Sequence, residues 1–369
     1  MKMYIYGFLT TSVLTLSIAP AVNIYNDLTG EKIIVSNPAG WVSKKNLYNL
    51  DFILPPFGLA YRHFGISIAP RLALNGKDGW MFLGDRYANT LTETRGLTPF
   101  NQEKLDLMAA NREKWNSYIK SLGGKGYVVT VAPNSQSIYP EKLPDWVAQS
   151  SSSKSIGYFL SHADKDRTLI DLSTELKNNV SKSKLPLFYK TDTHWNKQGA
   201  WYGYQKLATS LSHDFPDLKW LTPTDVSFTQ EIRPGGDMSR FQHIQEKITD
   251  TEIKVNIDIN SQVTVKDWSG ETLRSVGLSD GLSEANSPLH IYSSGALNKM
   301  KVLWLRDSFG IALYPYMNAT FSEIMERHFD AFTKKPEDLK ELIRTYQPDI
   351  VIITVIERSF SADFFMMEP

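Results

Sequence analysis

Three short apolar runs constrain the fold of this chain more than any other feature of its sequence. They read YVVTVA from Tyr127, VLWL from Val302 and IVIITV from Ile350. Continuous apolar runs of this length are typical of parallel strands that are buried on both faces. A fourth strand is expected within Arg167–Leu172. Helix-like segments alternate with these runs, so the sequence predicts an α/β fold, a parallel sheet in three layers with right-handed crossovers.

The composition excludes several classes of protein. Of 369 residues, 42% are hydrophobic and 22% are charged, which fits a globular protein of one large or two ordinary domains. Lys+Arg and Asp+Glu both number 40, so no net charge attracts nucleic acid or an acidic membrane. The absence of cysteine removes thiol catalysis, zinc–thiolate sites and disulfides.

The N-terminus carries an apolar stretch that is long enough to cross a membrane. Residues 3–22 have no charge and follow Lys2, so residues 1–22 are predicted to be a signal peptide or signal anchor with Lys2 inside. A buried first helix of the fold is the alternative. Residues 23–75, which contain several prolines, are interpreted as an irregular juxtamembrane segment. The catalytic domain is expected over residues 76–369.

A stretch of different character interrupts that domain. Residues 222–300 are rich in Thr, Val, Ile, Asp and Gly, with period-two stretches such as 252–257, and they are predicted to form a β-rich insertion. Within it, the loop RPGGDM contains Gly236 and Asp237, where the backbone could approach a ligand closely. A plain turn is the alternative for this loop.

A carboxylate and a histidine lie one residue apart in the stretch YKTDTHWNKQG, which begins at Tyr189. Asn196 is a plausible N-cap for the helical run that follows, so Asp192 and His194 are expected on a loop just before a helix. A histidine there can act as a general base, and a neighbouring carboxylate can fix its tautomer. A surface turn is the alternative.

A serine follows the strand predicted at Val302. The residues RDSFG lead from that strand into a helix-like run, so Ser308 would expose its hydroxyl at the carboxyl edge of the sheet. Its backbone N–H, at a helix N-terminus, can face a developing oxyanion. Open α/β sheets bind ligands at this edge, so Arg306 and Asn134, which follow two of the strands, are candidate substrate-binding residues.

These motifs together resemble a known family. DSFG at Asp307–Gly310 resembles the nucleophile block of the SGNH (GDSL-type) hydrolases, and Asp192-x-His194-x-Asn196 resembles the block that supplies their Asp and His. The histidine precedes the serine, as in a circular permutation, and this order is similar to the AlgX/AlgJ-like alginate O-acetyltransferases. The resemblance extends to four further stretches, which are Gly76–Asp85, Pro133–Glu141, Gly236-Asp237 and Glu357-Arg358. Relatives often carry a lysine after Pro133, where this chain has Asn134, and this leaves the charge preference for substrate open.

The resemblance implies a two-step acyl transfer. His194 takes the proton of Ser308 while Asp192 orients the imidazole; the serine is acetylated, and a sugar hydroxyl then attacks the acetyl-serine. It further implies an exported polysaccharide as acceptor and a multi-spanning membrane O-acyltransferase as the partner that supplies acetyl. The protein would be periplasmic, either anchored to the inner membrane or secreted after cleavage. No cofactor, metal or nucleic acid is expected.

The remaining candidate site residues are expected to contact the substrate. Gly236 and Asp237 lie in the glycine loop, and Trp195, like Trp201 and Tyr202, could stack on a sugar face; core packing is the alternative for each aromatic. Two other functions stay open at this level. A carbohydrate O-acetylesterase would use the same triad with water, and a non-catalytic glycan-binding protein would require that Ser308, His194 and Asp192 do not converge.

Overall fold

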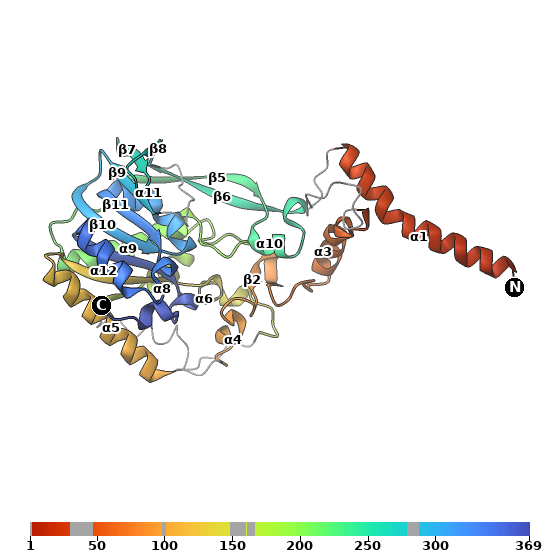
Figure 1. The fold of residues 1–369 in the computed structure, drawn as a ribbon, viewed down its shortest axis with the longest axis horizontal. Helices are drawn as coiled ribbons and strands as arrows, with labels where there is room; N and C mark the ends of the chain where they lie inside the picture. The colour runs from red at the N-terminus through yellow and green to blue at the C-terminus, as the bar shows by residue number, and fades with distance from the viewer. Residues whose placement is uncertain (1, 30–46, 98–100, 148–159, 161–166, 279–287) are drawn as a thin grey trace.

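A mixed eight-stranded sheet forms the centre of the molecule. The computed structural model describes residues 2–29, 47–97, 101–147, 160, 167–278 and 288–369. The strand order is β4-β3-β12-β10-β11-β9-β7-β8 (Figure 1). The first five strands are mutually parallel; they are β4 (Leu169–Asp171), β3 (Gly126–Ala132), β12 (Ile350–Ile356), β10 (Asn298–Arg306) and β11 (Phe321–His328). All four strands expected from the sequence lie here, so the predicted parallel α/β core is confirmed.

Three strands from residues 222–300 extend this sheet in the antiparallel sense. They are β9 (Leu289–Ser293), β7 (Gln262–Lys266) and β8 (Thr272–Gly277). The sheet is therefore mixed rather than purely parallel. In β9 and β7 buried and less buried residues alternate, because one face packs on the core and the other faces outward. The boundaries of an insertion at 222–300 stay a prediction.

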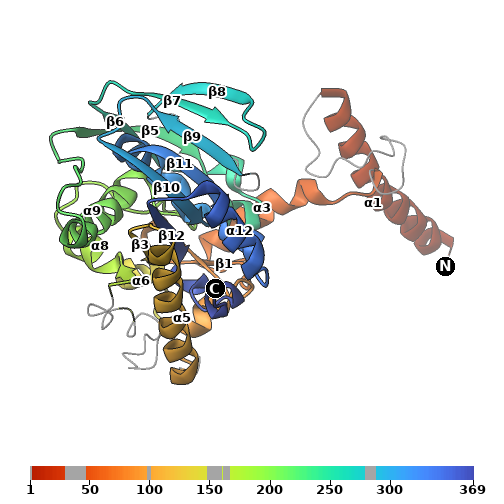
Figure 2. The ribbon, with the colours of Figure 1, turned by 60° about the vertical axis from the view of Figure 1, so that its left-hand side comes forward.

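Helices cover both faces of the parallel part of the sheet. Successive side chains of a strand point to opposite faces, so Val302 and Trp304 pack in one core and Leu303 and Leu305 in the other. The first core contains α8 (Ser173–Val180), α9 (Lys197–Asp214) and α11 (Tyr314–Thr320); the second contains α5 (Gln102–Ser121) and α12 (Pro336–Tyr346). Figure 2 shows α5 and α12 together on one side of the sheet. This is the expected three-layer arrangement.

Two smaller antiparallel pairs lie beside the main sheet. The strands β5 (Val226–Pro234) and β6 (Thr249–Ile257) form a long ribbon that reaches from the body towards α10 (Asp237–Phe241) (Figure 1). The hairpin expected near residues 75–85 is formed by β1 (Ala73–Asn75) and β2 (Met81–Leu83). The short helices α4 (Thr90–Thr94) and α6 (Ser135–Ile138) complete this side.

The N-terminal helix α1 (Lys2–Thr29) projects from the body (Figure 1). Its segment Lys2–Asn26 is long and apolar enough to cross a membrane, and only 6% of its most apolar window is buried, which argues against a buried first helix. The expectation of irregular structure over 23–75 was partly wrong. Leu54–His63 forms helix α3, because prolines are tolerated in the first turn, where no N–H is needed. Residues 30–46 lie outside the described part.

Candidate active site

The serine lies on a turn that the central sheet fixes in place. Ser308 begins a 3₁₀ helix, Ser308–Leu313, directly after β10, and Asp307 caps it. One oxygen of Asp307 accepts the Phe309 N–H at 2.8 Å, and the other accepts the Ile356 N–H from the end of β12 at 2.7 Å. The Asp307 N–H donates to the carbonyl of Thr354. The half-buried Ser308 hydroxyl is therefore held at the carboxyl edge of two buried strands.

The backbone N–H of Ser308 is available to a ligand. It is the first amide of its helix, a position that has no partner within the helix, and no acceptor for it is found among the described residues. A free amide beside a nucleophile can donate to an oxyanion that forms on the atom under attack.

The aspartate and histidine lie on a tight loop before α9. Phe188 and Trp195 form an isolated backbone bridge that closes this loop. Asn196 caps α9 as expected, because its side-chain oxygen accepts two N–H groups of the first turn at 3.0 Å. The indole N–H of Trp195 donates to the carbonyl of Phe309 at 2.8 Å. This bond ties the loop to the serine turn.

The structure brings Asp192, His194 and Ser308 into one line of hydrogen bonds. Nε2 of His194 lies 2.8 Å from Oγ of Ser308, and Nδ1 lies 2.7 Å from Oδ1 of Asp192. Oδ1 of Asp192 also accepts the backbone N–H of His194 at 3.1 Å. With the imidazole proton on Nδ1 and directed to Asp192, Nε2 is free to accept the proton of the Ser308 hydroxyl.

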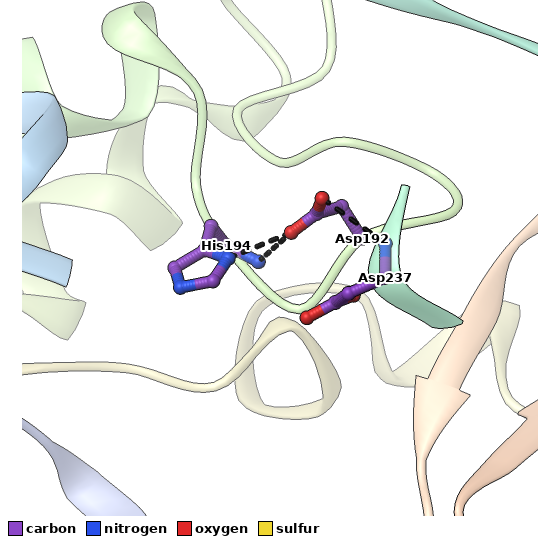
Figure 3. Close-up of side chains that lie close together, drawn as sticks. All are labelled: Asp192, His194 and Asp237. Atoms are coloured by element: carbon purple, nitrogen blue, oxygen red, sulfur yellow. Dashed lines mark hydrogen bonds and ion pairs between the residues drawn. The ribbon is translucent and has the colours of Figure 1, made fainter. Parts of the chain in front are cut away.

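Asp237 places a second carboxylate beside this line (Figure 3). Its two oxygens accept the N–H and hydroxyl of Thr193 at 2.8 and 2.6 Å, and its own N–H donates to Oδ2 of Asp192 at 3.3 Å. A Cβ on Gly236 would lie 2.5 Å from Oδ2 and 2.8 Å from Cγ of Asp192. Glycine is therefore required at position 236 for this approach.

Two residues of the β5–β6 ribbon hold the loop, and their roles were missed from the sequence. Asp250 accepts both the N–H and the hydroxyl of Thr191, at 2.7 and 2.5 Å. Arg233 lies 3.7 Å from Oδ2 of Asp192 and 3.3 Å from Glu252. These contacts join segments about 40 to 60 residues apart, which no local motif reveals.

The ionisation of the site follows from burial and from these neighbours. Burial opposes protonation of His194, but the hydrogen bond and charge of Asp192 outweigh it, and the pKa of His194 is raised. Burial likewise opposes ionisation of Asp192, but the hydrogen bond and charge of His194 prevail and lower its pKa. Burial, followed by the charge of Asp192, raises the pKa of Asp237. Asp192 is thus the stable anion of the site, and it stabilises the imidazolium form of His194.

Comparison with known proteins identifies the family. A family model described as an SGNH hydrolase-like domain of the acetyltransferase AlgX matches residues 73–273, which is more than half of the chain. The chain belongs to this family. It is therefore an O-acetyltransferase of the SGNH hydrolase-like class. The matched range contains Asp192, His194 and Asp237, whereas Ser308 lies beyond it.

Solved structures that have TM-scores above 0.5 with this chain show the same fold at low sequence identity. PatB1 of Bacillus cereus has a TM-score of 0.58 and 19% identity, covering 80% of this chain and 98% of that one. A DHHW family protein of Eubacterium siraeum gives 0.54 and 15%, covering 79% and 97%. The O-acetyltransferase domain of Pseudomonas putida AlgJ gives 0.46 and 17%, covering 81% and 94%. A comparison with curated proteins gives no match.

The side chain of Asn134, a candidate substrate-binding residue, is hydrogen-bonded to other protein groups. Its amide donates to Glu357 at 2.8 Å, and its oxygen accepts a hydrogen bond from Arg358 at 2.6 Å. The guanidinium of Arg358 lies 5.4 Å from the centre of the Phe309 ring, and the His194 ring lies 5.1 Å from the same ring. Asn134 thus positions Arg358, a cation near the triad that the sequence had not marked as a site residue.

Two candidate substrate-binding residues are corrected by the structure. Trp195 is 1% exposed and Arg306 is 0% exposed, so neither can contact a polysaccharide. Trp195 packs against Phe309, and Arg306 forms an ion pair with Glu326 inside the core. Arg306 shares the strand face of Trp304, which points into the core beneath the helices. Trp201 is also buried, against Tyr204 and Tyr316.

Asp192, His194 and Asp237 also have the composition of a metal site. Their ligand atoms lie within 4.8 Å of one another. These atoms already form hydrogen bonds, however. Asp192 is hydrogen-bonded to His194, and both carboxylate oxygens of Asp237 accept hydrogen bonds from Thr193. This arrangement fits a hydrogen-bonded acyl-transfer site.

Proposed function

We propose that Ser308, His194 and Asp192 transfer an acetyl group to a hydroxyl of an exported polysaccharide through an acetyl-serine intermediate. The observation that carries the proposal is the line of hydrogen bonds from Asp192 through His194 to Ser308, with lengths of 2.7 and 2.8 Å. A serine bonded to a base that a third group orients is the arrangement of an activated nucleophile.

In the first half-reaction, Oγ of Ser308 attacks the acetyl carbonyl carbon while Nε2 of His194 takes the hydroxyl proton. The oxyanion accepts a hydrogen bond from the Ser308 N–H, and Asp192 stabilises the imidazolium. The donor oxygen leaves with the proton from His194. In the second half-reaction, a sugar hydroxyl gives its proton to His194 and attacks the acetyl-serine, and Ser308 leaves as the alcohol.

The acetyl donor reaches this site from the membrane side. We propose that α1 anchors the protein to the inner membrane, with the catalytic domain in the periplasm. Acetyl-CoA is cytoplasmic, so a multi-spanning membrane O-acyltransferase would pass acetyl across the bilayer to Ser308. The apolar character and exposure of α1 support the anchor, and the family match supports acetyl transfer.

Trapping the intermediate tests the nucleophile. The purified protein is mixed with a chromogenic acetyl ester, quenched in acid and analysed by intact-protein mass spectrometry. We expect one added acetyl group on the wild type and none on Ser308→Ala. Ser121→Ala, which changes an exposed serine at the end of α5, is the matched control. Acetylation of Ser308→Ala, or ester cleavage by it at the wild-type rate, would refute the assignment.

The fate of the acetyl group distinguishes transferase from esterase. With candidate polysaccharides present, we expect acetyl to appear on the glycan, measured by NMR of the recovered polymer. Release of acetate alone, with every acceptor tested, would favour the carbohydrate O-acetylesterase.

A further inference from the structure

Large apolar side chains are exposed on helix α3 and its flanks. We call this set the apolar band; its members are Tyr48, Leu50, Phe57, Tyr61, Phe64 and Ile66, which are between 43% and 75% exposed. Single exposed apolar residues are ordinary, but a group of this size within twenty residues indicates a surface that something covers.

The orientation of α3 is fixed by the residues that face the catalytic domain. A Cβ on Gly58 would meet the carbonyl of Gln242 and lie 2.7 Å from Cγ2 of Ile244. One turn later, Arg62 bonds Oδ1 of Asn75 at 3.4 Å and the carbonyl of Gly79 at 3.2 Å. Gly58 and Arg62 therefore lie on the inner face, and the exposed Phe57 and Phe64 are held away from the domain.

The outer part of α3 lacks the charges that a water-facing helix normally carries. Residues 52–61 contain no charged residue. The charge at Arg62 is directed into the domain, which leaves His63 as the exposed basic side chain of α3. Within the range of the band, the half-buried carboxylate of Asp51 accepts a hydrogen bond from Asn49 at 3.0 Å. Exposed tyrosine and phenylalanine on a helix with so few charges are typical of segments that lie at a membrane–water interface.

The apolar band is continuous with the candidate membrane span. Near the end of that span, Asn23 of α1 donates to the carbonyl of Leu47 at 2.9 Å and to that of Asn49 at 2.8 Å. These carbonyls directly flank Tyr48, the first residue of the band. Figure 1 shows α3 between α1 and the catalytic body. A bilayer that surrounds α1 therefore meets the band next.

We infer that the apolar band lies in the lipid interface of the membrane that α1 crosses. The inference rests on α1 as an anchor and does not depend on which serine is acetylated. Because α3 packs on Gln242 and Ile244, directly after α10, and α10 begins at Asp237 beside the triad, docking of α3 fixes the orientation of the active site to the bilayer. An acetyl donor at the membrane surface would then approach a site of fixed orientation.

Environment-sensitive labels test the inference on the full chain. The chain has no cysteine, so Phe57→Cys and Phe64→Cys each accept a single NBD label. Labelled protein is placed in phosphatidylcholine/phosphatidylglycerol nanodiscs, one copy per disc, with and without lipids that carry a shallow nitroxide quencher. Lys184→Cys, on an exposed lysine far along the chain, is the aqueous control, and Leu14→Cys in α1 reports insertion of the helix.

We expect NBD at positions 57 and 64 to emit at shorter wavelength and to be quenched about twofold or more, because interfacial residues lie near the headgroups. Lys184→Cys should show neither effect. Water-like emission at 57 and 64 would overturn the inference, and so would an unquenched Leu14 label when a deep quencher is used. The measurement is repeated in nanodiscs that hold two copies. Short-wavelength emission seen only in those discs would indicate self-association and would overturn the inference. Thermal unfolding checks that each variant is folded. The experiment does not measure enzyme activity, so a negative result for the membrane inference is distinct from a negative result for the acetyl-transfer proposal.

Discussion

The two halves of the active site are held in different ways. The serine turn is tied to the sheet: Asp307 is buried, and its carboxylate accepts the N–H of Phe309 in that turn and the N–H of Ile356 at the end of β12. The Asp192/His194 loop lies outside the sheet and is held from the ribbon side, by Asp237 through Thr193 and by Asp250 through Thr191. The position of Ser308, the proposed nucleophile, is thus set by the core of the fold, whereas the position and pKa of His194, the proposed base, depend on a peripheral element.

This difference predicts which changes alter chemistry alone. Substitutions on the ribbon side should change rate and pH dependence in a protein that remains folded, because few core contacts are lost. Substitutions beside the serine turn should change stability, because that turn is part of the buried sheet.

Removal of the base should have the largest effect. His194→Ala should lower kcat/KM for an acetyl ester by about a thousandfold or more, because the members of a triad act as a unit. His213→Ala, an exposed histidine at the end of α9, should leave kcat/KM unchanged. A His194→Ala protein that retains a tenth or more of the wild-type activity would contradict the role of His194.

A methyl group at position 236 tests the ribbon side by steric means. Gly236→Ala places a Cβ against the carboxylate of Asp192, so the carboxylate must shift away from His194. We expect kcat/KM to fall by about a hundredfold, since misplacement of a catalytic group by an ångström has effects of this size. Gly126→Ala is the control, because the nearest atom to its Cβ would be 3.4 Å away. Equal activity of both variants would show that the site tolerates the shift.

Two charges near His194 should move the pH dependence in opposite directions. The charge of Asp237 raises the pKa of His194, after the larger effects of burial and Asp192, and the charge of Arg358 lowers it. Catalysis needs the neutral imidazole, so activity falls as pH drops through this pKa. Asp237→Asn should shift the acidic limb of kcat/KM to lower pH, and Arg358→Gln should shift it to higher pH. Shifts in the same direction would contradict this electrostatic account.

The parallel core was predictable because burial on both faces leaves a local signature. The runs in β3, β10 and β12 are apolar without alternation, and helices separate them. The three antiparallel strands were expected only as part of an insertion. In β9 and β7 the alternation shows that one face is buried, but one partner strand of β9 is β11, which comes later in the chain. Pairing of this kind depends on distant sequence and has no local pattern.

The same distinction applies to the site. The convergence of Asp192, His194 and Ser308 was predictable because each lies in a compact motif beside a strand or helix. Arg358 and Asp250 act across long separations in sequence, so spacing could not assign their roles. Arg306 was assigned to the substrate because it is charged and next to the serine. Arg306 lies two residues after Trp304 and four after Val302, so its side chain is on the same face of the strand as theirs, and that face packs in the core. This spacing indicated a buried position for Arg306.

Substitution of Arg306 should therefore have the smallest effect on activity. Arg306→Met leaves Glu326 buried without its partner, which should cost about 3–5 kcal/mol of stability, while kcat/KM per folded molecule stays near wild type. Burial raises the pKa of Glu326 to about 7, although Arg306 opposes this. A raised folded-state pKa means that the contribution of Glu326 to stability is lost as pH rises through that value. Loss of Arg306 should raise the pKa of Glu326 further. The cost of Arg306→Met should therefore be larger at pH 8, where Glu326 is ionised in the wild type, than at pH 5, measured by denaturant unfolding. Arg306→Met/Glu326→Leu should recover most of the stability, because no unpaired charge remains in the core. A fall in kcat/KM of the folded double variant would instead return Arg306 to the substrate site.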